Sequence, residues 1–307
     1  MKRCLISMGF LALGLQVQAH EYVTFEELGA AFGYDLENKQ IVTETVAPGI
    51  HVLFGVGGNI VVSIGDQGVL MVDSQFPEMI PRISRAIENL GGDGIDFTVN
   101  THWHFDHASG NPPLGRDGAW MVSQANSRRM MAGEHEIDLV SLAYLQPAFS
   151  DEAMPVITFT DEMQFHFNGH TIDLMHYGPA HTTGDAAVLF RESNVVHMGD
   201  VFNAAGYPFI DAGNGGDLNG MIHFCKKVLA RLDEDSVVVP GHGMVAGYND
   251  LAAYVAMLET VRNRINGMID AGMSLEDVLN ASPTADFDEK FGNPARFIDR
   301  SYKSLSR

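Results

Sequence analysis

Residues 102–107 read His-Trp-His-Phe-Asp-His, and four of these six side chains are of types that bind metal ions. His102 and His104 alternate directly after an apolar run over residues 95–99, so in extended backbone they point to one side. Asp106 and His107 follow on a turn and can face a second point nearby. The spacing therefore suits two metal ions held side by side, an arrangement that activates water and stabilises leaving groups.

Further candidate ligands follow later strand-like runs. His181 lies within residues 178–185 (GPAHTTGD), Asp200 ends the sequence Met-Gly-Asp over 198–200, and His242 lies in the Pro-Gly-His-Gly turn over 240–243. Asp73 ends another apolar run. Because loops after strands present side chains on a rigid scaffold, we expect these segments to carry the chemistry.

Alternating apolar runs and helical patterns predict the elements that position these residues. Strands are expected over 50–54, 60–64, 69–72, 97–100, 163–167, 171–175, 186–190, 195–198 and 237–239. Helices are expected over 77–90, 217–232 and, more weakly, 123–145, then from Asn249, from about Ser274 and over 286–302. Strands and helices alternate in two blocks, 45–185 and 186–245. This predicts layered α/β packing with helices outside a pair of sheets.

In motif and in order, these segments resemble the metallo-β-lactamase superfamily, and the resemblance spans about residues 48–245. It implies an α/β fold of the αββα sandwich type, with the site along one edge of the two sheets. Residues 20–307 would form a single domain, with a motif core over 45–245 and a helical C-terminal extension over 249–305.

The family's ligand set maps onto this chain. By the resemblance, His102, His104 and His181 hold one Zn²⁺, Asp106, His107 and His242 hold a second, and Asp200 bridges the two or serves the second alone. Asp73 would orient a ligand imidazole without touching metal. The two metal ions would together activate a water molecule for attack on a carbonyl. Asp106 would orient that water and carry a proton. Iron or manganese suits such ligands as well.

Two loops favour a β-lactam as substrate. Residues 211–217 (DAGNGGD) resemble a zinc β-lactamase loop whose Asn binds substrate or polarises the lactam carbonyl, which would be the role of Asn214. A Gly-rich turn that caps the next helix explains these residues equally well. Phe54 opens a short Gly-rich segment where β-lactamases carry a substrate-covering hairpin, and a plain hairpin turn is the equal alternative.

Other positions depart from that subclass. In the zinc β-lactamases with that loop, a Cys ligand occupies the position of Asp200 and a residue other than His occupies the position of His107. At the position of Asn203 they commonly have a Lys that binds the substrate carboxylate. The leading hypothesis is a β-lactamase of modest or broad specificity. The alternatives are a hydrolase of thioesters, lactones or other small esters, an iron-dependent persulfide dioxygenase, and a metal-binding protein without catalysis.

The first residues predict export. Lys2 and Arg3 precede an apolar stretch from Cys4 to Leu15, and Ala19 ends a signal-peptide cleavage site. We expect cleavage after Ala19, a periplasmic or secreted product, and no membrane contact afterwards.

Removing 19 of the 307 residues leaves 288, and the loss of Lys2 and Arg3 takes the formal charge from −20 to −22. Such an acidic surface disfavours nucleic acid and leaves a small molecule as the expected partner. Cys225 would be the one remaining cysteine, and we expect it to be a buried apolar residue.

Overall fold

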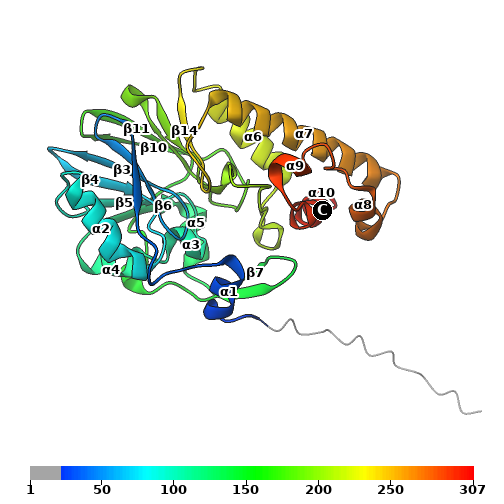
Figure 1. Ribbon diagram of the computed structural model, residues 1–307, viewed down its shortest axis with the longest axis horizontal. Coiled ribbons are helices and arrows are strands. Elements are labelled where there is room, and N and C mark those ends of the chain that lie inside the picture. Colours follow the sequence, from blue (N-terminus) through cyan, green and yellow to red (C-terminus); the bar gives the residue numbers. More distant parts are fainter. Residues whose placement is uncertain (1–21) are drawn as a thin grey trace, which may run out of the picture.

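The computed structural model describes residues 22–307, so the predicted signal peptide over residues 1–19 lies outside the described residues. Two large sheets stack against each other, and helices cover their outer faces (Figure 1). α2 (Ile80–Asn89) and α4 (Asn111–Arg116) lie on one side, whereas α6 (Leu218–Leu229) and α7 (Tyr248–Asp270) lie on the other. This layering confirms the predicted α/β class and αββα sandwich.

The first sheet has seven strands in the order β1-β2-β3-β4-β5-β6-β9. Their bounds are β1 (Val42–Ala47), β2 (Ile50–Phe54), β3 (Ile60–Gly65), β4 (Gly68–Val72), β5 (Phe97–Asn100), β6 (Trp120–Gln124) and β9 (Ile157–Phe159). An antiparallel meander over β1–β4 continues into the parallel pairs β4–β5, β5–β6 and β6–β9. Parallel pairing brings the carboxyl ends of β4 and β5 to the same edge.

The second sheet has six strands in the order β10-β11-β12-β13-β14-β15. Their bounds are β10 (Glu162–Phe167), β11 (His170–Met175), β12 (Ala187–Phe190), β13 (Val195–His197), β14 (Val237–Val239) and β15 (Ala246–Gly247). Only the β13–β14 pair is parallel, so the ends of these two strands share an edge. A separate hairpin pairs β7 (His135–Asp138) with β8 (Ala143–Gln146).

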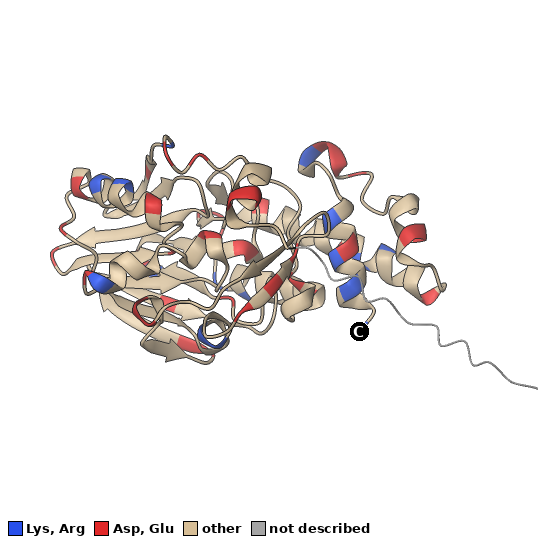
Figure 2. Cartoon of the chain, turned by 90° about the horizontal axis from the view of Figure 1, so that it is seen from below, with Lys and Arg blue, Asp and Glu red and all other residues tan. Residues whose placement is uncertain are grey.

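The remaining helices fill the connections and the C-terminal region. They are α1 (Phe25–Phe32), α3 (Phe105–Ala108), α5 (Ala125–Met131), α8 (Leu275–Ala281), α9 (Asp288–Phe291) and α10 (Ala295–Leu305), with 3₁₀ turns at η1 (Pro77–Met79), η2 (Asp151–Ala153), η3 (Arg191–Ser193), η4 (Gly199–Val201) and η5 (Ala212–Asn214). Between residues 22 and 307, no helix combines the length and the apolar content needed to cross a membrane. Acidic segments are spread over the exposed loops and helices (Figure 2).

Apolar side chains on both faces of the strands explain the layers. In β2, Ile50 and Val52 pack between the two sheets, and Leu53 packs on the opposite face with the cluster that includes α2. Alternation along a strand places successive side chains on opposite faces, so a continuous apolar run buries both. Cys225 is fully buried in the third cluster, with α6 and α7, as expected.

Two predicted helices are wrong in extent. Residues 123–145 hold one short α-helix, α5, followed by the β7–β8 hairpin, because Ile137 and Tyr144 form a cross-strand apolar pair. The helix expected over 286–302 is divided into α9 and α10. Gly292 has a φ of +81°, and Pro294 cannot continue the hydrogen-bond ladder.

Candidate metal centre

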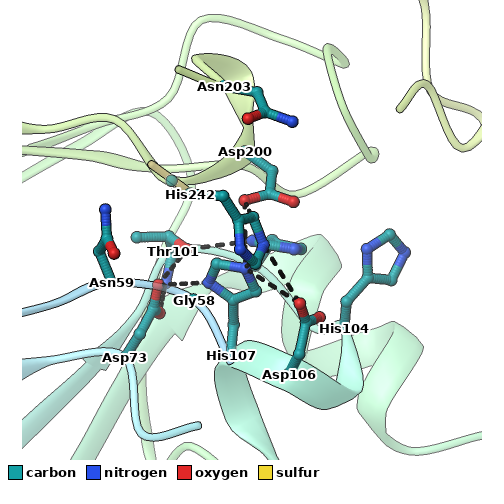
Figure 3. Close-up of polar contacts among 12 residues, drawn as sticks. Gly58, Asn59, Asp73, Thr101, His104, Asp106, His107, Asp200, Asn203 and His242 are labelled. Carbon is teal, nitrogen blue, oxygen red and sulfur yellow. Dashed lines mark hydrogen bonds and ion pairs between the residues drawn. The ribbon is translucent and has the colours of Figure 1, made fainter. Parts of the chain in front are cut away.

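The predicted ligands come from loops at one edge of the sandwich. His102 and His104 follow β5 and lead into α3, which carries Asp106 and His107. His181 lies in the loop after β11, Asp200 lies in η4 after β13, and His242 follows β14. The structure brings all seven side chains together, and Figure 3 shows most of them around one point.

His102, His104 and His181 form one group of converging ring nitrogens. His181 Nε2 lies 2.8 Å from His104 Nδ1, and the ligand atoms of all three residues lie within 4.8 Å of one another. His102 Nε2 is buried and has no hydrogen-bond partner among residues 22–307. An unsatisfied imidazole nitrogen costs free energy unless another group accepts its lone pair, so this group fits a metal ion bound through nitrogen.

Asp106, His107 and His242 form a second group beside the first. His242 Nε2 lies 3.2 Å from both His107 Nε2 and Asp106 Oδ2. Asp200 lies between the groups, with Oδ1 3.1 Å from His107 Nε2 and Oδ2 3.7 Å from His181 Nε2. Its two oxygens therefore face both groups, as a carboxylate bridging two ions would.

The imidazoles are held through their rear nitrogens. His107 Nδ1 lies 2.8 Å from Asp73 Oδ2, and His104 Nε2 lies 3.0 Å from Asp211 Oδ2. His181 Nδ1 lies 2.7 Å from the carbonyl oxygen of Phe209. Donation to these acceptors places the proton on the rear nitrogen and leaves the front nitrogen as a metal ligand.

Asp73 is itself rigidly placed. Its carboxylate accepts hydrogen bonds from the Thr101 N–H at 2.7 Å and from the Thr101 hydroxyl at 2.8 Å. Its φ is +65°, in the left-handed region, which is uncommon for a residue with a side chain and clusters at functional sites. The structure thus places Asp73 behind His107, where the predicted orienting role requires it.

The pKa values of the candidate ligands shift in both directions. Burial alone would raise the pKa of Asp200, but the imidazoles of His242 and His107 outweigh it and hold the pKa well below its ordinary value. Burial lowers the pKa of His102 and of His181. At His107 and His242 burial acts in the same direction, but the carboxylates of Asp200 and Asp106 outweigh it: they raise the pKa of His107 well above its ordinary value and that of His242 to about 10. A metal ion bound by these two imidazoles would therefore displace a proton from each.

The Gly-rich segment after β2 is tied to the site. The N–H of Gly58 donates to the Asp106 carbonyl at 3.0 Å, and Asn59 Nδ2 donates to the carbonyls of Pro240 at 2.9 Å and Gly243 at 2.8 Å. A Cβ on Gly58 would lie 2.1 Å from Cε1 of His107, so only glycine fits there. This segment therefore holds the His242 loop in place.

A cavity of about 530 Å³ opens over the candidate ligands. Its walls come from α1, the β7–β8 hairpin, the loop over 203–209 and the start of α10; its apolar lining includes Phe32, Val56, Phe105, Ile137, Leu139, Val140, Pro208, Phe209 and Phe297. Asn203, the residue found where zinc β-lactamases have Lys, also lines it (Figure 3). The cavity has the size and largely apolar lining of a small-molecule site.

Two predicted substrate contacts lie elsewhere. Asn214 does not line the cavity; its Nδ2 donates to the Glu136 carbonyl at 2.7 Å and to the Asp211 carboxylate at 2.9 Å. Asn214 therefore holds Asp211 in place, and Asp211 is the hydrogen-bond partner of His104. Phe54 packs toward the core between the sheets, and Val56 lines the cavity instead. Substrate contact by either residue stays a prediction, which this placement does not favour.

Sequence reasoning missed Asp211 and Asn59. Asp211 is the first residue of the loop singled out for Asn214, and Asn59 ends the segment singled out for Phe54. Both loops were recognised, but their partners lie 107 and 181 positions away in the chain. No local pattern could identify which side chain of each loop reaches the site.

Comparisons with known proteins agree with this geometry. The sequence model of the Metallo-beta-lactamase superfamily matches residues 53–242. The Lactamase-like protein aptB of Emericella nidulans is 25% identical over 214 residues, which cover 67% of this chain and 59% of the relative. The chain therefore spans less than two thirds of that relative's length.

Solved structures share the fold at low identity. DIM-1 metallo-beta-lactamase has a TM-score of 0.57 at 18% identity, covering 72% of this chain and 98% of its own. Metallo-beta-lactamase from Pontibacter korlensis has a TM-score of 0.58 at 17% identity, covering 72% and 99%. The stereoselective inverting sec-alkylsulfatase Pisa1 from Pseudomonas sp. has a TM-score of 0.65 at 14% identity, covering 86% of this chain and 50% of its own.

The family match covers more than half of the chain and contains every predicted ligand, which confirms the predicted resemblance. The chain belongs to the metallo-β-lactamase superfamily, whose members are metal-dependent hydrolases.

Proposed function

We propose that the chain is an exported dinuclear zinc hydrolase that opens the ring of β-lactams. The observation that carries this proposal is the convergence of seven ligand side chains beneath a largely apolar cavity. His102, His104 and His181 would hold one ion, and Asp106, His107 and His242 the other, with Asp200 between them. When bound, two such ions supply an activated water at neutral pH and stabilise a leaving anion.

The chain's own residues supply positioning and proton transfer. Asp106 lines the cavity, and its side chain is 12% exposed, so its carboxylate faces both His242 and an incoming substrate. A carboxylate in this position accepts a proton and hands it to a leaving group. Asp73 and Asp211 keep the imidazoles of His107 and His104 in fixed orientations, which fixes the positions of the reacting groups relative to one another. The apolar walls limit access of bulk water.

A second candidate is hydrolysis of lactones, thioesters or other small esters. The placement of Asn214 against Asp211 favours it, because that amide is then engaged inside the protein and not offered to a lactam carbonyl. Asp200 in place of a cysteine ligand supports the same candidate. Both candidates share attack on a carbonyl and differ in the leaving group.

The test uses the chain from His20 onward, loaded with zinc, beside the same protein stripped with a chelator. Ring opening of a chromogenic cephalosporin is followed by absorbance, and a thioester and a lactone are assayed in parallel. We expect zinc-dependent turnover that Asp106→Asn reduces at least about 100-fold. Asp286→Asn, an exposed carboxylate whose side chain is 67% accessible, serves as the matched control.

The outcomes separate the candidates. Turnover of the ester substrates without ring opening would refute the β-lactam proposal and leave the second candidate. Iron bound to the protein together with oxygen consumption in the assay would indicate a persulfide dioxygenase. Metal binding without any turnover would indicate a non-catalytic protein. Cell fractionation of the full chain tests export, since a product that stays cytoplasmic and uncleaved contradicts it.

A further inference from the structure

An arginine lines the cavity beside the histidines of the candidate metal centre. Arg296, at the start of α10, is the one Lys or Arg among the described residues that do so. It comes from the C-terminal extension, beyond residues 53–242 that match the family. Figure 2 shows basic segments along this helix next to the C-terminus, in a chain that is otherwise strongly acidic.

Arg296 is anchored, but its charge is not compensated by a carboxylate. Its Nε donates to the carbonyl of Leu139 at 3.1 Å, and its Cζ lies 5.6 Å from the ring centroid of Phe32. No carboxylate within residues 22–307 forms an ion pair with it. Arg300, one turn further along the helix, differs sharply, because Asp138 at 2.8 Å and Asp299 at 2.6 Å pair with its guanidinium.

The energetic consequence follows from burial. Arg296 is partly buried, and burial together with the nearby Arg300 lowers its pKa from the ordinary value. A partly desolvated cation without a partner is unfavourable, and an anion brought by a ligand would relieve that cost. The cavity's own carboxylates, Asp106 and Asp200, face the imidazoles of the metal centre.

We propose that Arg296 binds a carboxylate of the substrate, which restricts the substrates to acidic lactams or esters. This inference rests on the proposed function for the identity of the reacting bond. The cation that Asn203 lacks is thus supplied from the C-terminal helix, on a different wall of the cavity. A guanidinium held by Leu139 and stacked on Phe32 presents its remaining N–H groups to a carboxylate as a planar fork.

The first test is equilibrium binding, which does not require turnover. Calorimetry on the zinc-loaded protein compares 4-phenylbutyrate with the neutral 4-phenylbutanol. We expect the carboxylate to bind more tightly, and Arg296→Met to weaken its binding about 10- to 100-fold while binding of the alcohol stays unchanged. Arg296→Lys should recover part of the loss, since it keeps the charge without the fork.

The control is Lys303→Met, which removes the same charge from the same helix outside the cavity. It should bind both probes as the wild type does, and thermal unfolding should show that each variant is folded. A carboxylate held by zinc alone would bind equally to wild type and Arg296→Met. Equal binding, or no binding of the carboxylate to the wild type, overturns the proposal.

Kinetics give the second test. One substrate is assayed both as the free carboxylate and as the methyl ester of that carboxylate. Arg296→Met should raise KM for the acid about 10-fold or more without changing its kcat, and should leave both KM and kcat for the ester unchanged. If no lactam or ester is hydrolysed while calorimetry still depends on Arg296, the proposed function fails and the anion site stands. Turnover of both forms without dependence on Arg296 supports the hydrolase and overturns the anion site.

Discussion

Replacing Asp211 with Asn tests whether the rear hydrogen bond of His104 sets metal affinity. Asp211 is 1% exposed and uses both carboxylate oxygens. Its Oδ2 accepts from His104 Nε2 at 3.0 Å, and its Oδ1 accepts from the Asn214 N–H at 3.2 Å and from Asn214 Nδ2 at 3.0 Å. An amide of the same shape offers one oxygen and turns an NH₂ group toward one of these donors. At least one buried donor then loses its acceptor, which costs about 1–3 kcal/mol.

The same change should weaken zinc binding. Loss of a carboxylate behind a ligand imidazole typically lowers metal affinity about 10–100-fold, or about 1.4–2.8 kcal/mol. His104 belongs to the first group only, so the effect should fall on one of the two proposed ions. Competition with a chromophoric chelator measures both affinities, and urea unfolding of the zinc-free protein measures the loss of stability separately.

Asp286→Asn is the control, because its exposed carboxylate pairs with Arg264 at the surface and such pairs contribute little. If Asp211→Asn left both zinc affinities within about twofold of the wild type, the proposed link between Asp211 and metal binding would be refuted. A loss of stability without a loss of affinity would make Asp211 a structural residue alone.

Three further predictions concern the supports of the site and the sandwich. Gly58→Ala should abolish zinc retention, because its Cβ would lie 2.1 Å from His107 Cε1; dialysed protein that keeps its zinc contradicts this. Asn59→Ala should lower the free energy of unfolding by about 1–3 kcal/mol, because the carbonyls of Pro240 and Gly243 lose a buried donor, and activity should fall with it. Denaturant curves that match the wild type would exclude this role. Burial alone would raise the pKa of Asp173, but hydrogen bonds from Arg191 and Gln164 outweigh it and lower that pKa. Its stabilisation is therefore full above the unfolded pKa of about 3.9 and is lost as pH falls through the folded value. Asp173→Asn should destabilise the protein at neutral pH and flatten this acid dependence, and parallel stability curves for both proteins would rule this out.

Much of the site could be predicted because its motifs are local. The spacing of His102, His104 and His107 needs only the geometry of an extended segment and the turn after it. Strands such as β2, β5 and β14 were predicted at their observed bounds, because each is a short run rich in β-branched and aromatic residues and is buried along most of its length. β1 was missed because its first four residues are exposed at a sheet edge and carry no apolar pattern.

The amino-acid sequence by itself determined the motif resemblance to the family, the alternation of strands and helices that predicts layered α/β packing, and which side chains could bind metal. Those properties depend on residue type and on short-range periodicity, which a chain carries whether or not it is folded.

Only the tertiary structure decided which nitrogen of each imidazole faces the site and which residue supports it from behind. His104 meets Asp211 across 107 positions, and Asn59 meets Pro240 across 181. One wall of the cavity likewise forms where α10 docks on the β7–β8 hairpin, with Arg296 bonded to Leu139 and Arg300 to Asp138. Such contacts depend on how distant elements pack, so no spacing along the chain reports them.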